Sequence, residues 1–288
     1  MRIEDLADKF PLGRLGRRRP LVSVVPLVGT IGIKGRLRDS FNFMSVAARL
    51  ERAFSLRGAK AVALAINSPG GSPVQASLIA NRIRALSTEK KLPVFAFAED
   101  VAASGGYLLA LAADDIYANE SSIVGSIGVI SAGFGFDQVL EKLGVERRVH
   151  TSGPKKAMLD PFQPENPKDV ERLKSIQKQV HETFKDFVKQ RRGARLNGSA
   201  RKLFSGEFWA AAQALELGLI DGVGDMRTVM RDQFGDRVKF RYFGAERPWF
   251  RSRLGFDGQA PALSPPVGWP EDVLATLDAR ALWARFGL

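Results

Sequence analysis

A serine flanked by small residues stands at position 104, in the stretch Ala103-Ser104-Gly105-Gly106-Tyr107. The apolar run at residues 92–98 predicts a buried strand before it, and residues 106–113 predict a short helix after it. A serine at such a junction suits a nucleophile, because glycine lets other backbone approach and a helix N-terminus favours developing negative charge. The simpler interpretation is a serine that caps the helix, and an isolated stretch of this kind favours that interpretation.

A second glycine-rich turn, Asn67-Ser68-Pro69-Gly70-Gly71, follows a predicted strand at residues 60–66. The backbone N–H of Gly71 can supply one donor of an oxyanion hole, and the N–H of Gly105 can supply the other. A Pro-Gly turn alone ends strands in many α/β proteins. Its pairing with the Ser104 stretch makes the catalytic interpretation considerably stronger.

The partner of a nucleophilic serine must come from a short list of side chains. The chain has no cysteine and only two histidines, His150 and His181, so thiolate chemistry is excluded and no metal site or cofactor is expected. A lysine can replace histidine as the base, but only where an apolar site lowers its pKa. Lys155 and Lys156 are candidates, although a solvated pair in a loop is the simpler interpretation of both.

The elements around these motifs alternate between strands and helices. Continuous apolar strands separated by helices predict a parallel sheet covered on both faces, an α/β domain. Ligands bind at the carboxyl ends of such strands, where Gly71 and Ser104 are expected. Strands are predicted at residues 21–28, 60–66, 92–98, 115–118, 145–150 and 238–243, and helices at 42–56, 75–87, 106–113, 136–143, 167–192, 209–217, 226–234 and 271–286.

Composition and charge indicate an ordinary globular protein with a basic surface. The chain has 288 residues, 45% hydrophobic and 26% charged, with a formal net charge of +12. Most basic runs are solvated faces, and an anionic membrane surface or an acidic partner fits better than nucleic acid, for which no motif is present. No apolar run is long enough to span a membrane and no signal peptide is visible, which predicts a cytoplasmic or peripherally membrane-associated protein unless an anchor was removed.

Several motifs, in order, carry a family resemblance. Residues 66–71 followed by 102–107 resemble the shared frame of the Clp-protease/crotonase superfamily. Within it, residues 103–107, Gly125-Ser126-Ile127-Gly128-Val129 and Ser152-Gly153-Pro154-Lys155-Lys156 resemble the signal peptide peptidase (SppA, protease IV) family. The resemblance covers about residues 21–245, and the stretches 204–206 and 214–221 fit the tail of that family.

The resemblance implies a serine endopeptidase with a Ser/Lys dyad on a Clp-protease/crotonase-like parallel-sheet core. Ser104 would be the nucleophile, Lys156 the general base and Ser126 the residue that orients the lysine, while Gly71 and Gly105 would hold the oxyanion. The implied substrates are signal-peptide remnants or other unfolded or membrane-derived peptides, cleaved through an acyl-enzyme. A lysine base also predicts activity that rises towards alkaline pH.

The resemblance further implies a homo-oligomeric ring in which adjacent subunits can supply the serine and the lysine. The predicted organisation is a basic arm at residues 1–20, one peptidase domain at 21–245, and a Pro/Gly-rich linker with an amphipathic helix at 246–288. Two alternatives stay open on the same fold. One is an acyl-CoA enzyme of the crotonase type, and the other is a non-catalytic scaffold at a membrane surface.

Overall fold

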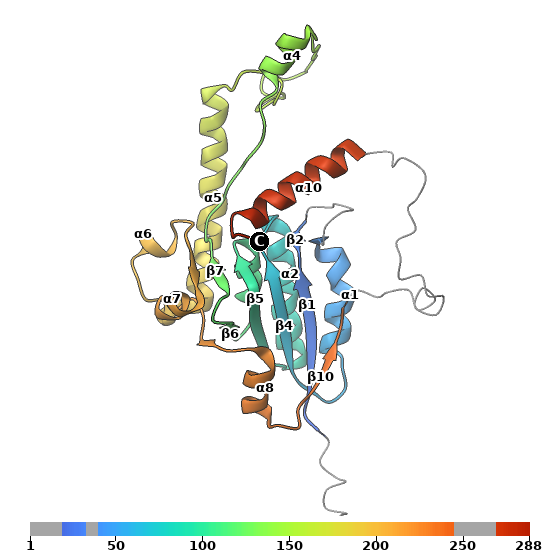
Figure 1. The fold of residues 1–288 in the computed structure, drawn as a ribbon, viewed down its shortest axis with the longest axis vertical. Helices are drawn as coiled ribbons and strands as arrows, with labels where there is room; N and C mark the ends of the chain where they lie inside the picture. Colours follow the sequence, from blue (N-terminus) through green and yellow to red (C-terminus); the bar gives the residue numbers. More distant parts are fainter. Residues whose placement is uncertain (1–18, 33–39, 245–268) are drawn as a thin grey trace, which may run out of the picture.

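A mostly parallel sheet forms the centre of the computed structural model, which describes residues 19–32, 40–244 and 269–288 (Figure 1). Its strands lie in the order β10-β1-β4-β5-β6-β9, and β7 pairs with the end of β5 and, antiparallel, with β8. A separate parallel pair is made by β2 and β3. The strands are β1 (Leu21–Val28), β2 (Thr30–Ile31), β3 (Ser40–Phe41), β4 (Ala59–Ser68), β5 (Val94–Ala103), β6 (Asp115–Ala118), β7 (Ile123–Gly125), β8 (Phe208–Ala210), β9 (Gly222–Val223) and β10 (Lys239–Tyr242).

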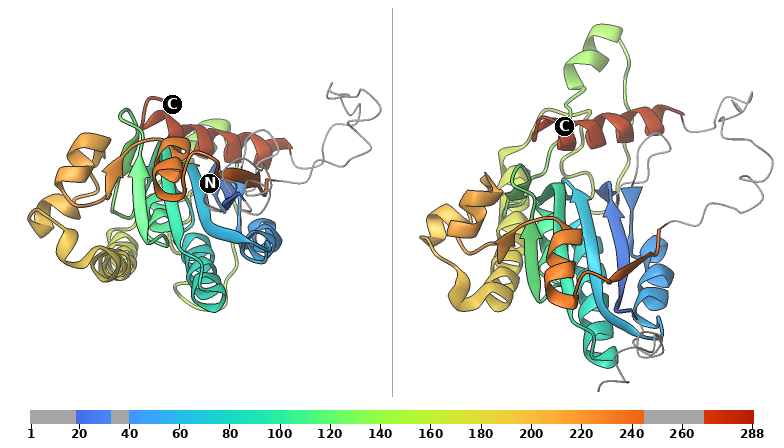
Figure 2. Two further views of the ribbon diagram at one scale, coloured as in Figure 1. Left: turned by 90° about the horizontal axis from the view of Figure 1, so that it is seen from below. Right: turned by 60° about the horizontal axis from the view of Figure 1, so that its bottom comes forward.

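Helices cover both faces of the sheet (Figure 2). The larger core lies under α1, α2, α3 and the end of α5, and a smaller core packs Met230 of α8 against Val22, Val24, Phe95 and Phe97. This layering confirms the predicted α/β architecture. The helices are α1 (Phe43–Phe54), α2 (Pro73–Lys90), α3 (Gly105–Ala110), α4 (Asp137–Leu143), α5 (Pro167–Arg192), the 3₁₀ turn η3 (Gly193–Arg195), α6 (Ala200–Leu203), α7 (Ala211–Glu216), α8 (Met226–Phe234) and α10 (Trp269–Ala284).

Two of the predicted elements are wrong. Residues 145–150 form no strand, because their side chains are exposed and no neighbouring strand pairs with them among the described residues. Trp209 belongs to β8 rather than to a helix, since it pairs with Val124 of β7. The predicted N-terminal arm and the linker before α10 lie largely outside the described residues.

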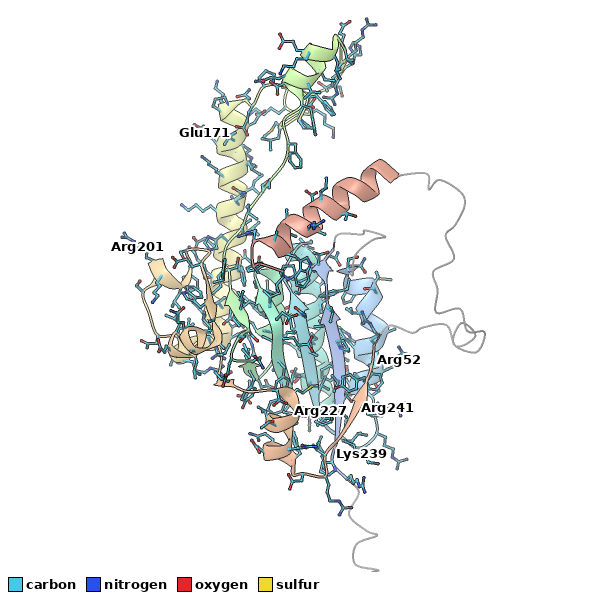
Figure 3. All side chains as sticks on the ribbon, in the orientation of Figure 1. Arg52, Glu171, Arg201, Arg227, Lys239 and Arg241 are labelled. Carbon is cyan, nitrogen blue, oxygen red and sulfur yellow. The ribbon has the colours of Figure 1, made fainter. Side chains whose placement is uncertain are left out.

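A long arm, residues 130–176, projects beyond the carboxyl ends of the strands (Figure 1). It contains α4 and the first turns of α5, where Glu171 stands well clear of the sheet (Figure 3). None of the α4 residues is buried, and Leu143 is 69% exposed. Other apolar side chains of the arm are exposed as well, namely Ile130, Phe134, Val139, Val145, Val149, Leu159, Phe162 and Ile176. The arm therefore leaves apolar surface uncovered in the single chain.

The opposite end of the molecule carries a group of basic side chains. Arg227, Lys239 and Arg241 lie there around α8 and β10, far from the arm (Figure 3). No described helix is long and apolar enough to cross a membrane.

One carboxylate, Asp221, joins the long helix α5 to the sheet. It accepts hydrogen bonds from Arg192 Nη1 at 2.7 Å, from Ile116 N at 2.8 Å and from Arg195 Nη1 at 3.1 Å. Burial acts to raise the pKa of Asp221, but the hydrogen bonds from Arg192 and Ile116 together with the charges of Arg192 and Arg195 hold that pKa below its usual value. The ionised carboxylate therefore stabilises the fold.

Replacing this carboxylate by an amide is expected to destabilise the protein in a pH-dependent way. Asp221→Asn should lose about 2 kcal/mol of unfolding free energy at neutral pH. Because the folded-state pKa is depressed, the wild-type advantage is present above the unfolded-state pKa and disappears as pH falls through the folded-state pKa. Urea denaturation at neutral and acidic pH measures this, with the exposed Asp236→Asn as control. An equal difference at both pH values would contradict it.

Candidate active site

Ser104 lies at the turn from β5 into α3, in a conformation that non-glycine residues rarely adopt. Its φ is 52° and its ψ is −119°, and its backbone N–H donates to Gly125 O at 2.8 Å. Although Ser104 is the N-cap residue of α3, its side chain makes no capping hydrogen bond. The simple capping interpretation is therefore wrong, and strain of this kind is found preferentially at functional sites.

The two glycines after β4 pack directly against the Ser104 turn. A Cβ added at Gly70 would lie 2.9 Å from Ser104 Cβ, and one at Gly71 would lie 2.2 Å from Ile31 O. Hydrogen bonds hold the turn in place, from Ile31 N to Gly70 O at 2.9 Å and from Ser72 N to Ile31 O at 2.8 Å. Ile31 of β2 is a positioning residue that the sequence pattern did not indicate.

The backbone of Gly71 packs closely against that of Gly105, the residue that follows Ser104. A Cβ added at Gly105 would stand 3.4 Å from Gly71 N, which shows how close the two backbones are. Neither N–H donates to another backbone or side-chain group in the described part of the chain. Two unpaired donors beside a serine can stabilise a negative oxygen. The structure thus brings together three of the predicted site residues.

Ser126 is the neighbour of Ser104 on the adjacent strand. The parallel pairing of Ala103 with Gly125 ends β5 and β7 at the same level, so the two serines follow side by side. Ser126 is 4% exposed, has a φ of 52° and donates its N–H to Glu207 O at 2.7 Å. The backbone N–H bond to Glu207 is the only hydrogen bond that Ser126 makes among the described residues.

Lys156 lies away from these groups, in an exposed turn of the arm where its N–H donates to Gly153 O at 3.1 Å. The loop packs on α4 through Phe136 N, which donates to Pro161 O at 2.6 Å. Lys155 and His150 are exposed on the same arm. The single chain therefore does not bring Lys156 to Ser104.

The other histidine, His181, faces the backbone, with its Nε2 3.1 Å from Ile127 O. Tyr107 is fully buried and donates its hydroxyl to Leu219 O at 2.7 Å, while burial raises its pKa. Both residues have structural contacts in this chain. No group of three or more potential metal ligands lies within the part of the chain that the structure describes.

A mostly apolar cavity of about 660 Å³ opens at Ser104. Its size is in the usual range for a ligand site. Its walls come from the turn at residues 69–71, from α2, α3 and α5, from residues 128–132, and from the last turns of α10. The contribution of α10 was not indicated by the sequence, because its apolar pattern predicts docking but does not name the surface on which it docks.

Comparison with known proteins gives consistent matches. A family model described as peptidase family S49 matches residues 87–234. The serine protease SPPA, chloroplastic, of Arabidopsis thaliana is 30% identical over 223 residues, which is 76% of this chain and 32% of that protein. The solved structure of a membrane-bound stomatin-specific protease variant with a substrate peptide covers 83% of this chain and 97% of its own, with a TM-score of 0.50 at 16% identity, and shares the fold.

A protein of Brucella abortus named Na(+)/H(+) antiporter NhaA is 49% identical over 272 residues. The alignment covers 93% of this chain but 37% of the Brucella protein, and the chain likewise spans about a third of the Arabidopsis protein. The described residues contain no helix that could span a membrane. Because the alignment covers 37% of the Brucella protein, the name of that protein does not assign an activity to this chain.

Proposed function

This chain belongs to peptidase family S49, a family of serine peptidases with a Ser-Lys dyad, and we propose that it hydrolyses peptide bonds with Ser104 as the nucleophile. One observation carries the proposal. Ser104 begins a helix without capping it, and it lines an apolar cavity beside the unpaired N–H groups of Gly71 and Gly105. A structural serine has no need of this arrangement, whereas an attacking serine needs all of it.

The reaction follows from these positions. A base takes the proton from Ser104 Oγ, and the oxygen attacks the substrate carbonyl carbon. The carbonyl oxygen becomes an oxyanion that accepts hydrogen bonds from Gly71 N–H and Gly105 N–H, each worth about 3 kcal/mol in the transition state. The C–N bond then breaks, the base returns its proton to the leaving amine, and water hydrolyses the acyl-enzyme.

The base in this proposal is Lys156 of a neighbouring copy, in a homo-oligomeric ring. Its exposed position on the arm, together with the uncovered apolar side chains there, supports a partner that covers both. In this arrangement the hydroxyl of Ser126, beside Ser104, accepts a hydrogen bond from the incoming amine and orients it. A lysine from a second subunit would then complete the site.

The proposed substrates are unfolded or membrane-derived peptides, including signal-peptide remnants, with small or apolar residues near the cleaved bond. The apolar side chains of Val74, Leu78, Phe184 and Phe187 in the cavity support this preference. We propose that the protein acts in the cytoplasm or at a membrane surface. If a longer chain carries a membrane anchor, the proposed location is the outer side of the membrane.

A fluorophosphonate probe tests the nucleophile. We expect it to label the wild-type protein at Ser104 and the exposed control Ser121→Ala equally, and to leave Ser104→Ala unlabelled. Mass spectrometry of the labelled peptide locates the probe, and circular dichroism checks that each variant is folded. A folded wild-type protein that resists the probe and leaves casein intact would contradict the proposal and favour the non-catalytic scaffold.

A further inference from the structure

The last turns of α10 form a wall of the cavity at Ser104. In Figures 1 and 2, α10 crosses beyond the carboxyl ends of β4 and β5, the edge at which the catalytic turns lie. The cavity is lined by Asp278, Ala281 and Leu282 of α10 and by Arg285, which directly follows the helix. The spacing of Asp278, Ala281 and Leu282 places these three residues on one side of the helix.

Other residues of α10 and of the turn that follows it hold the helix in place. Phe286 is buried against Val101 and Ala103 of β5, and its ring meets the ring of Phe208 at 5.0 Å between centroids. Trp283 packs against the same cluster, and Ala279 is 4% exposed. Since Ala103 directly precedes Ser104, the contact of Phe286 with Ala103, called the Phe286 anchor below, fixes the end of α10 next to the nucleophile.

The described residues that give the cavity its charge lie in the C-terminal segment, at residues 278–285. Asp278 and Arg285 are the only charged residues among the described lining residues, and the remaining walls are apolar or carry hydroxyl groups. The chain has a net charge of +12. Arg227, Lys239 and Arg241, three of its basic residues, lie at the far end of the sheet and not at the cavity (Figure 3). Among the described residues of one chain that line the cavity, only these two can select substrate side chains by charge.

We propose that α10 is part of the peptide-binding site and that Arg285 and Asp278 select substrate residues of opposite charge at two separate positions. This inference rests on the proposed peptidase function. Arg285 adjoins the Phe286 anchor and so lies at the Ser104 end, where it favours an acidic side chain close to the cleaved bond. Asp278 lies seven residues earlier, about 10 Å along the helix.

The separation of the two charges sets the spacing in the substrate. An extended peptide advances about 3.3 Å per residue, so Asp278 favours a basic side chain roughly three residues further from the cut than the acidic one. Both charged residues line the cavity and are exposed, so they can bind a partner without a large desolvation penalty. The apolar walls between them would receive the intervening side chains.

A peptide set with a single varied position tests the inference. Fluorogenic apolar peptides carry Glu, Lys or Gln at one position, scanned over about five positions on each side of the cut. The readout is the ratio of kcat/KM for the Glu and Lys peptides within each variant, because a general loss of activity cancels in that ratio. We expect the wild-type protein to prefer Glu by about tenfold at one position near the cut, and Lys by a similar factor about three residues away.

Charge reversal assigns each preference to its residue. Arg285→Glu should invert only the preference near the cut, and Asp278→Lys only the distant one. Arg280→Glu, on the same helix but outside the cavity lining, should keep both preferences and the activity. Two results would overturn this inference and leave the proposed function intact. In one, both reversed variants keep the wild-type preferences. In the other, the wild-type protein cleaves the Gln peptides but shows no charge preference. A protein that cleaves no peptide and resists the fluorophosphonate would instead overturn the proposed function.

Discussion

Oligomers that contain both Ser104→Ala and Lys156→Ala subunits are expected to cleave peptides, although each variant alone is inactive. Each single change should lower kcat/KM by at least about 10⁴-fold, because nucleophile and base act as one unit. In a mixed ring, some sites receive Ser104 from one subunit and Lys156 from its neighbour. With random assembly in equal amounts, about a quarter of the sites are complete, so about a quarter of the wild-type activity should return.

The experiment uses co-expression with two different affinity tags and purification through both in sequence. Lys155→Ala is the matched control, because Lys155 is the exposed neighbour of Lys156, and it should keep its activity. Inactive mixed oligomers would show that one subunit supplies both residues. Full activity in Lys156→Ala alone would remove Lys156 from the mechanism. Light scattering on each sample measures whether the oligomer has formed.

The parallel core could be predicted because its signals are local. The continuous apolar run at residues 21–28 forms β1, and α5 begins at Asn166-Pro167 as the sequence predicts. The predicted strand at residues 145–150 is wrong because Val145 and Val149 are the only apolar residues of that stretch, and both are exposed. Those residues lie on the arm, whose apolar side chains are uncovered in a single copy.

The candidate site could be predicted only in part for a related reason. Gly71, Ser104 and Gly105 follow adjacent strands, and the carboxyl ends of adjacent parallel strands meet at one edge, so their proximity follows from the topology. The position of Ser126 beside Ser104 depends on the pairing of β7 with β5. A strand of three residues is too short for the sequence to indicate its partner. The α10 wall depends on long-range packing of Phe286 against Val101 and Ala103, for which the sequence holds no local signal.

Gly71→Ala is expected to abolish most of the activity by displacing an oxyanion donor. The added Cβ would lie 2.2 Å from Ile31 O and 2.8 Å from Ile31 N, and both atoms are backbone of β2 that cannot rotate away. The turn must therefore move, and the Gly71 N–H moves with it. The φ of 141° adds strain, because L side chains rarely adopt it. We expect kcat/KM to fall by at least about a hundredfold, the usual cost of losing one such donor.

Gly58→Ala separates this effect from backbone strain. Gly58 also has a positive φ, 84°, but a Cβ added there meets nothing within 4 Å. It should lose about 1 kcal/mol of unfolding free energy and keep its activity, since the strain is present without the displacement. Activity is compared well below both melting temperatures, so that folded protein is measured in each case. If Gly71→Ala cleaved peptides as fast as Gly58→Ala, the N–H of Gly71 would have no part in holding the oxyanion. A loss confined to Gly71→Ala would tie catalysis to the contact between the Gly70-Gly71 turn and Ile31, since that contact is what differs between the two glycines.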